Sequence, residues 1–501
     1  MSLLFIGYQW LSIWIYNNIA YNESNFSRTE GPVQATVKED SKLLAHLMRR
    51  AGFGSTYSEL KEISHLSYDE IVDSLISPKD TSWMGAHVIR RHHFEHASMM
   101  SSRGLGEFWL YRMATTKSPL IEKMTLFWHN IFATGYPKVV HGMQKNYQIN
   151  MFRTMCFEDL DSILLELSKD PSMIIWLDNQ ENHNGAINEN FGRELLELFS
   201  MGVGNYSEDD IKECARAFTG WTIANRDYMV ERSERDSDQP FGRIAWHFKF
   251  DEKDHDFGEK TFLGEKGNLN GEDIVRIICN QESTAKFIAR QLYNFFIEDE
   301  VPVPSWNDIL PKNPEAIDIL VKSYFDNDHS IKEMVKTLLK SDFFKSDNVR
   351  YKRVKSPVEL VTGVLRITGD LDRPKRSMFN HFGKMEYMGQ WLTNPPTVEG
   401  WHEGHEWIET GSIVERVNYA SEQLSNETLP GIKKIISNIT EISNSREDIP
   451  QICLQELGIL DVSNETMQIL MEFAKNPDIP NEKIISGVIK LIAASPDFQN
   501  C

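Results

Sequence analysis

The 501-residue chain is poor in cysteine. It has five, at Cys156, Cys214, Cys279, Cys453 and Cys501. They are odd in number, widely spaced and never arranged as CxxC, so the sequence supports neither a zinc ribbon nor a disulfide framework. The first three fall in apolar segments with helical periodicity, where a cysteine behaves as a small buried hydrophobic residue. Cysteine usage therefore does not indicate the cellular compartment.

The chain also lacks an excess of basic charge. Its 53 Lys and Arg residues are outnumbered by 73 Asp and Glu residues, which gives a net charge of −20. Such a surface repels phosphate backbones and anionic membranes, and this argues against nucleic-acid binding. GxSxG, Walker and dinucleotide-binding motifs are missing as well. The sequence therefore identifies no cofactor.

Long apolar runs are confined to the start of the chain, between Leu3 and Ile15. No Lys or Arg precedes this run, and residues 17–21 (NNIAY) make a poor cleavage site for a signal peptide. The run is also short for a membrane-spanning helix. An export signal of unusual form, an anchor through which residues 3–15 associate with a membrane, and a misassigned start all stay open. From about residue 41 no second run of spanning length occurs.

The sequence is rich in signals for helices. Three Ser–Glu pairs have the capping-box spacing, namely Ser67 with Glu70, Ser330 with Glu333 and Ser356 with Glu359. Apolar residues recur with helical periodicity over residues 105–116, 119–132, 159–169, 271–296, 314–340, 357–367 and 464–475. The sequence therefore predicts a mainly α protein with a multi-helix globular core.

One segment, residues 241–263, departs from the helical pattern. Polar and aromatic residues alternate in AWHFKFD at 245–251, and this indicates a small β-hairpin inserted among the helices, with its turn at residues 255–258. We divide the chain into an apolar N-terminal segment with a polar linker (1–40), a main helical domain with the β insertion (41–425) and a C-terminal helical segment (426–501).

The densest polar chemistry lies in residues 188–198, NENFGRELLEL. On a helix, Glu189, Arg193 and Glu197 share one stripe, and Asn190 and Glu194 share the next. A Leu-rich face lies beside them. This pattern fits charges held at the wall of a cavity, and it fits equally a surface helix with weak Glu–Arg pairs.

Six dispersed motifs of this chain resemble, in the same order, a bacterial family named domain of unknown function 1800. They are RRAGFG at 49–54, LFWHNIFAT at 126–134, the acidic helix with its continuation to Thr222, HDFGEK at 255–260, NPPTVEGW at 394–401 and ASPDFQ at 494–499. The resemblance covers about residues 42–499. It implies an envelope or exported protein rather than a cytoplasmic one, and a sulfatase-like partner protein, but no activity.

Two of these motifs supply histidines. His129 lies in an otherwise apolar helix, where a hydrogen-bonded core histidine and a functional group are equally favoured. Many family members have a second histidine where this chain has Ile131, so a metal site built on such a pair lacks one ligand here. His255 and Asp256, with Lys260 nearby, suit acid–base chemistry or cation binding, and capping of a turn is the alternative.

Two other histidine-rich segments lie outside the family motifs or directly after them. HHFEH at residues 92–96 contains the HxxxH spacing of some metal sites, but a solvated or substrate-facing segment is the favoured interpretation. HEGHE at 402–406 follows Gly400 and Trp401. It indicates either a loop that lines a pocket or a solvated turn held by Trp401 and Trp407.

These observations select thirteen candidate site residues. The catalytic candidates are Glu189, Arg193, Glu194, Glu197, His129, His255 and Asp256. The substrate-binding candidates are Asn130, Asn190, Lys260, Trp221, Trp401 and His402. We assign no metal ligand, because Arg193 already supplies a cation among the helical carboxylates.

The favoured hypothesis is an enzyme with a carboxylate, arginine and histidine pocket that acts on a carbohydrate-like or other polar substrate. Paired carboxylates with different neighbours can divide acid and base roles, and Arg193 can hold an anionic group or keep a carboxylate ionised. Two alternatives stay open. One is a non-enzymatic envelope protein for binding or assembly, working with the sulfatase-like partner. The other is a carboxylate and histidine metal oxidoreductase.

Overall fold

The computed structural model describes residues 39–84, 101–139, 141–225 and 244–501. The predicted apolar segment at 3–15 and the HHFEH segment at 92–96 lie outside these ranges. The described part is mainly α-helical, with two small two-stranded antiparallel sheets, which confirms the predicted fold class. No helix in this part is both long and apolar enough to cross a membrane.

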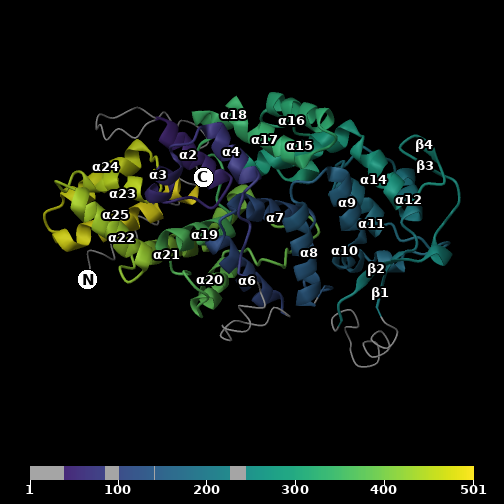
Figure 1. Cartoon of the computed structure of the whole chain (residues 1–501), viewed down its shortest axis with the longest axis horizontal. Coiled ribbons are helices and arrows are strands. Elements are labelled where there is room, and N and C mark those ends of the chain that lie inside the picture. Colours follow the sequence, from purple (N-terminus) through teal and green to yellow (C-terminus); the bar gives the residue numbers. More distant parts are fainter. Residues whose placement is uncertain (1–38, 85–100, 140, 226–243) are drawn as a thin grey trace.

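Figure 1 shows the arrangement of the helices, which are joined by connections of varied length such as the long one over residues 388–409. The first half contains α2 (Glu39–Arg50), α3 (Tyr57–Ile63), α4 (Tyr68–Ile76), α6 (Ser102–Thr115), α7 (Pro119–Ile131), α8 (Gly142–Met155), α9 (Leu160–Lys169), α10 (Pro171–Trp176), α11 (Asn190–Glu197) and α12 (Glu208–Ala217). The strands are β1 (Trp221–Ala224), β2 (His247–Phe250), β3 (Lys260–Phe262) and β4 (Glu265–Gly267).

The second half returns across the molecule. It contains α14 (Gly271–Cys279), α15 (Glu282–Phe296), α16 (Pro314–Asp326), α17 (Ile331–Lys340), α18 (Asp342–Lys345), α19 (Pro357–Thr368), α20 (Ser377–Tyr387), α21 (Thr410–Leu424), α22 (Pro430–Ile442), α23 (Ile449–Glu456), α24 (Asn464–Lys475), α25 (Asn481–Ala494) and α26 (Pro496–Gln499). Figure 1 places α22–α25 at one end of the molecule and the strands at the other, with α7 and α19 between them.

Local capping explains where many helices begin. Ser67 and Ser356 form full capping boxes with Glu70 and Glu359, whereas Ser330 caps α17 only through its own side chain. Two of the predicted periodic runs are each two helices. The 271–296 run breaks between α14 and α15, and the 314–340 run breaks where Asp328 and His329 take positive φ values of 49° and 62°. Left-handed backbone interrupts a helix whatever the periodicity of its side chains.

The strand pairing differs from the predicted hairpin. β2 pairs antiparallel with β1, so that Trp221 lies opposite Phe250, and β3 pairs with β4. The predicted turn at 255–258 therefore connects two different sheets. The alternating pattern identified strand β2 correctly, but its partner lies before the inserted segment, and side-chain periodicity carries no information on partners.

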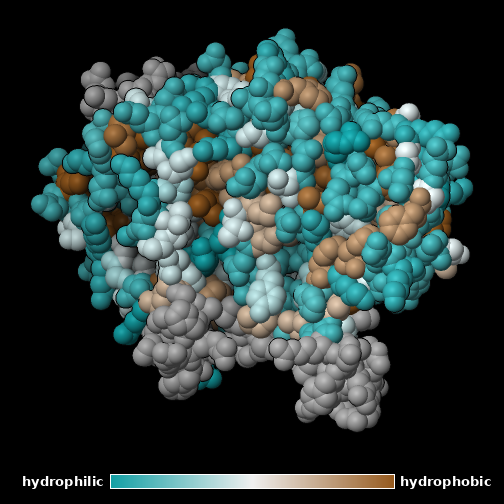
Figure 2. All heavy atoms as spheres, turned by 45° about the vertical axis from the view of Figure 1, so that its right-hand side comes forward, coloured by the Kyte–Doolittle hydropathy of each residue, from teal (hydrophilic) through white to brown (hydrophobic). Residues whose placement is uncertain are grey.

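One apolar core runs through the molecule. Its buried residues extend from Leu44 to Phe498 and continue across the boundary predicted near residue 425, since Leu424 and Ile432 belong to the same cluster. All five cysteines are buried free thiols. Figure 2 shows a largely hydrophilic face on which apolar residues gather in separate small areas.

Candidate functional site

A cleft of about 1360 Å³ opens where segments distant in the sequence meet. Its walls are the end of α7, the end of α15 with the loop that follows, and the segments 347–354, 397–408 and 496–500. A volume of this size accommodates a small ligand or a section of a polymer.

The cleft is acidic. Nine carboxylates line it, namely Glu298, Asp299, Glu300, Asp347, Glu399, Glu403, Glu406, Asp461 and Asp497. The lining contains four Lys or Arg residues, which are Lys42, Lys312, Arg350 and Lys352. Trp306, Tyr351 and Trp401 add aromatic surface. Carboxylates combined with aromatic rings suit a polar ligand that also has flat apolar faces.

Asn130, at the end of α7, positions one wall of the cleft. Its amide nitrogen donates to Glu403 Oε1 at 2.8 Å, and its amide oxygen accepts a hydrogen bond from the backbone N–H of Trp401 at 2.9 Å. Gly400 lies against it with a φ of 96°, and a Cβ there would come within 2.4 Å of the Asn130 carbonyl oxygen. Two of the family-like motifs, 126–134 and 394–401, therefore interlock at this point.

Glu403 is held from two sides. Asn130 donates to one carboxylate oxygen and Asn294, on α15, donates to the other. Burial raises the pKa of Glu403, and the nearby Arg353 guanidinium only partly offsets this effect. The carboxyl group therefore binds a proton more readily than an exposed glutamate, in an orientation fixed by two amides.

Asp299 is the second cleft carboxyl with a raised pKa. Burial is the main cause, and Arg353 and the backbone N–H of Val354 counteract it. That N–H donates to Asp299 Oδ2 at 2.9 Å, and Oδ1 lies 3.7 Å from Arg353 Nε. Asp299 and Glu403 thus face the same guanidinium from different segments.

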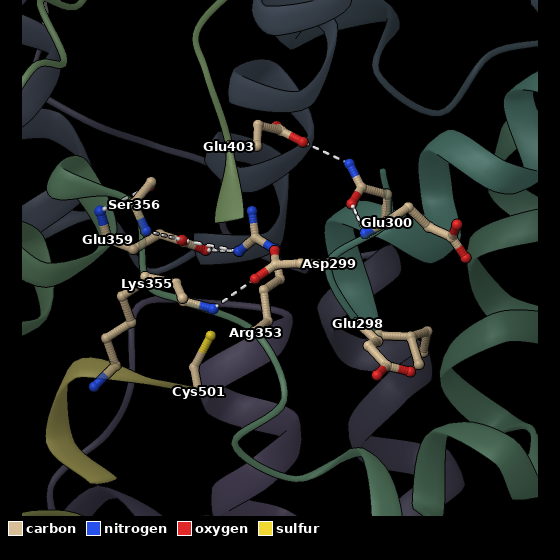
Figure 3. A network of polar contacts seen from close by, with 12 residues as sticks. Glu298, Asp299, Glu300, Arg353, Lys355, Ser356, Glu359, Glu403 and Cys501 are labelled. Carbon is tan, nitrogen blue, oxygen red and sulfur yellow. Dashed lines mark hydrogen bonds and ion pairs between the residues drawn. The ribbon is translucent and has the colours of Figure 1, made fainter. Parts of the chain in front are cut away.

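Arg353 belongs to a buried ionic network behind the cleft (Figure 3). Its Nη1 donates to both oxygens of Glu359 at 2.9 Å, and Lys123 binds the same carboxylate. The Ser356 backbone N–H donates to Glu359 Oε2 at 2.8 Å as part of the α19 capping box. Although burial alone would raise the pKa of Glu359, Arg353 and Lys123 hold it well below its ordinary value. Glu359, in the first turn of α19, therefore holds Arg353 in the segment that leads into this helix.

The acidic helix α11 reaches the cleft only at its end. Arg193 is engaged by Glu208, with a closest contact of 2.9 Å, and by Glu189 at 3.3 Å. Glu197 accepts a hydrogen bond from Tyr206 at 3.0 Å. Leu198, the next residue, lines the cleft. The predicted Glu–Arg stripe is therefore an ion-paired surface beside the cleft.

Glu194, on the neighbouring stripe, has a pKa raised to about 7. Burial is the main cause and the charge of Glu197 adds to it, while Arg193 opposes the shift. Glu399, which lines the cleft, also contributes. Glu194 is therefore influenced by the charge of one cleft residue, Glu399. Asn190 begins the same helix and is exposed.

His129 lies behind the cleft and is only 1% exposed. Its ring centroid is 5.4 Å from that of Trp401 and 5.5 Å from that of Trp109. Burial, assisted by the charge of Lys145, lowers the pKa of His129 to about 3. Within the described ranges neither ring nitrogen has a hydrogen-bond partner. The histidine is therefore neutral at physiological pH and supports the Trp401 ring.

The second histidine motif forms its own polar network beside the sheets. His255 is buried, with Nδ1 2.8 Å from the Thr219 carbonyl oxygen. Asp256 accepts from Arg216 Nε at 2.7 Å, and the Lys260 ammonium donates to the carbonyl oxygens of Asp256 and Gly258. Trp221 is buried too, and its indole donates to Asn270 at 3.0 Å. None of these candidates lines the cleft described above.

The HEGHE segment forms the outer part of the cleft. His402 is exposed and its Nδ1 lies 2.7 Å from Glu406 Oε2. Trp401 is buried against Val354 and Trp407. The 402–406 segment therefore lines the cleft, which is one of the two alternatives that its sequence left open.

Comparison with known proteins places the chain in a family. A family model described as "Protein of unknown function (DUF1800)" matches residues 46–500, nearly the whole chain. The protein belongs to the DUF1800 family. No curated protein and no solved structure matches.

The cleft of this DUF1800 protein brings together some of the predicted site residues and not others. The residues that line it are Asn130, Trp401 and His402. Glu194 does not line it, but the charge of Glu399, which does, contributes to the raised pKa of Glu194. The sequence analysis did not select four residues of this region, namely Asp299, Glu403, Asn294 and Arg353. Only Glu403 had a signal, since it lies in the HEGHE segment.

We expect Glu194→Gln to stabilise this DUF1800 protein at alkaline pH. Because the folded-state pKa of about 7 exceeds the ordinary value of 4.5, ionisation of Glu194 favours the unfolded chain, and the penalty develops as pH rises from 4.5 to 7. The amide removes that penalty. Thermal unfolding should give the variant the higher midpoint at about pH 8 and no advantage at about pH 4.

The control for this experiment is Glu441→Gln on the exposed part of α22, which makes the same chemical change away from the cleft. We also expect Glu194→Gln to impair function more than it impairs folding. A fall in the unfolding midpoint of Glu194→Gln at both pH values would identify Glu194 as a structural ion-pair residue instead.

Proposed function

We propose that this protein is a hydrolase whose cleft binds a carbohydrate-like substrate, with Glu403 and Asp299 as the acid–base pair. The observation that carries the proposal is the presence of two half-buried carboxyl groups with raised pKa values near one guanidinium, in a cleft with aromatic walls. Pairs of carboxyl groups in distinct environments are the usual apparatus for cleaving glycosidic bonds.

The environments of the two groups suggest their roles. Asp299 has the backbone N–H of Val354 and the charges of Arg353 and Arg50 to stabilise its ionised form. Glu403 has Arg353 and the Asn294 amide to stabilise its ionised form, and the negative charges of Asp299 and Glu359 oppose them. In this proposal Glu403 donates a proton to the leaving oxygen, and the Asp299 carboxylate accepts a proton from the attacking water.

The decisive variant is Glu403→Gln. The amide keeps the size of the side chain and cannot donate a proton as an acid, so we expect kcat to fall about 10²–10⁴-fold. Release of reducing ends from a panel of oligosaccharides measures the rate, and calorimetry measures binding, which should persist. Glu441→Gln, the same chemical change on the exposed part of α22 away from the cleft, serves as the matched control. Full activity of Glu403→Gln would remove Glu403 from the mechanism.

A second candidate is a binding or assembly protein that works with a sulfatase-like partner. It is favoured by the network of His255, Asp256 and Lys260. These side chains form hydrogen bonds or ion pairs with neighbouring groups of the protein, as expected for a structural role. Oligosaccharide binding without any turnover by the natural chain, together with co-elution of a sulfatase-like protein in size-exclusion chromatography, would favour this candidate.

A further inference from the structure

Asn294, in the last turn of α15, makes two hydrogen bonds that lead in different directions. Its amide nitrogen donates to Glu403 Oε2, and its amide oxygen accepts the backbone N–H of Glu300 at 2.8 Å. Glu300 directly follows Asp299 in the chain. One buried side chain therefore contacts both of the segments that carry the proposed acid–base pair.

The orientation of the Asn294 amide is determined by its partners. A backbone N–H can only donate, so the amide oxygen must face Glu300 and the NH2 group must face Glu403. Asn130 is arranged in the same way, since its oxygen accepts the backbone N–H of Trp401 at 2.9 Å and its nitrogen donates to Glu403 Oε1 at 2.8 Å. Neither amide can reverse without losing its bond to a backbone N–H, and both oxygens of Glu403 therefore accept from fixed donors.

The loop that follows α15 is tied to the helix at further points. The Glu300 carboxylate forms a buried ion pair at 2.7 Å with Arg290, which lies one helical turn before Asn294. The other carboxylate oxygen of Glu300 accepts the backbone N–H of Lys312 at 2.8 Å. The loop is thus anchored on α15 through both the side chain and the backbone of Glu300, and Asn294 extends this anchorage to Glu403.

We infer that Asn294 is the positioning residue of the acid–base pair, which holds Glu403 in place relative to the loop that carries Asp299. The inference rests on the proposed function, because it takes Glu403 and Asp299 as the reacting groups. Asn294 acts through Glu403 and requires no contact with the substrate. It adds a residue that couples the geometry of one reacting group to that of the other.

The neighbours of Glu403 determine what loss of the Asn294 bond does. Burial raises the pKa of Glu403, and the negative charges of Asp299 and Glu359 act in the same direction, while Arg353 and the Asn294 amide oppose them. Removal of the Asn294 donor therefore raises the pKa of Glu403 further. Since Glu403 is the proposed general acid, the alkaline limb of the pH–rate profile, where that acid loses its proton, should move to higher pH.

Two variants of the full chain test the inference. Asn294→Asp keeps an oxygen that accepts from Glu300 and loses the donor to Glu403, whereas Asn294→Ala loses both bonds. We expect Asn294→Asp to keep KM within about twofold, to lower kcat about tenfold or more and to move the alkaline limb upward by about one pH unit. Asn294→Ala should move the limb in the same direction and also lower the unfolding midpoint. Release of reducing ends from the oligosaccharide panel, followed across pH, measures the rates.

Asn476→Asp is the matched control. The amide oxygen of Asn476 also accepts a backbone N–H, that of Asp478 at 2.9 Å, in an exposed segment that does not line the cleft. The same chemical change there should leave kcat and the pH–rate profile as they are in the natural chain.

An unaltered pH–rate profile of Asn294→Asp, in a protein whose natural chain is active and whose Glu403→Gln variant is not, would overturn the inference and leave the proposed function standing. Should one Asn294 variant fail to fold, the profile of the other gives the answer. Failure of both variants to fold would identify Asn294 as a structural residue and overturn the inference as well. No turnover by the natural chain at any pH would overturn the inference together with the proposed function.

Discussion

Glu359→Gln is expected to destabilise the protein by about 3–5 kcal/mol, since it leaves two buried cations without their anion. The Lys123 side chain is 1% exposed and that of Arg353 is 4% exposed, and both bind the Glu359 carboxylate. The amide keeps one acceptor oxygen and turns an NH2 donor towards the donors of the other, so the loss combines the charge with the hydrogen bonds of one oxygen. Chemical denaturation near neutral pH measures the effect, with Glu441→Gln as the control for a Glu-to-Gln change on an exposed helix face.

The pH dependence of this effect has a defined sign. The folded-state pKa of Glu359 lies well below the ordinary value of 4.5. The stabilisation is therefore fully present above pH 4.5 and is lost as pH falls towards the folded-state value. The deficit of the variant should accordingly be constant at neutral pH and shrink in acid. Equal denaturation midpoints of variant and natural chain at neutral pH would show that Asp299 alone balances the two cations.

Gly400→Ala should damage the cleft more than any other change of a single methyl group in its lining. The φ of 96° strains any residue with a Cβ, and the added atom would lie 2.4 Å from the carbonyl oxygen and 2.6 Å from the amide oxygen of Asn130. Since backbone strain of this type costs about 1–3 kcal/mol, the 400–403 segment should shift, and Glu403 should lose its bond from Asn130.

The measurement is oligosaccharide binding together with thermal unfolding. Gly411→Ala is the matched control, because a Cβ there meets no atom within 4 Å. We expect Gly400→Ala to weaken binding and lower the unfolding midpoint, and Gly411→Ala, which lies in α21, to leave binding unchanged and not to lower the midpoint. Unaltered binding by Gly400→Ala would mean that the segment around Trp401 does not position the ligand.

Features set by a few consecutive residues were predictable from the sequence. The capping pair Ser356 and Glu359 begins α19 as expected, because capping depends on neighbours three residues apart. The break at Asp328 and His329 was not predicted. Side-chain periodicity continues through a change of backbone conformation, so the 314–340 run resembled one long helix.

The candidate site was predictable only where its residues lie in motifs. Asn130 and Trp401 were selected on that basis, but the bond that joins Asn130 to Glu403 spans 273 residues. Nothing in the local sequence around Asp299 or Arg353 indicates that they face each other. Glu359 was recognised as a capping residue, yet its second role as the counter-ion of Arg353 and Lys123 depends on packing between α7 and α19.

The interlock of Asn130 with the 400–403 segment also determines when the cleft can exist during synthesis. Its walls include residues near 130, 300, 350, 400 and 500, so much of the helical scaffold is translated before the last wall leaves the ribosome. Contacts of such sequence separation form late because long loops must close first. During synthesis the carboxylates of the earlier walls are therefore exposed before the last wall is present. We expect ligand binding to be acquired only with residues 496–500 in place.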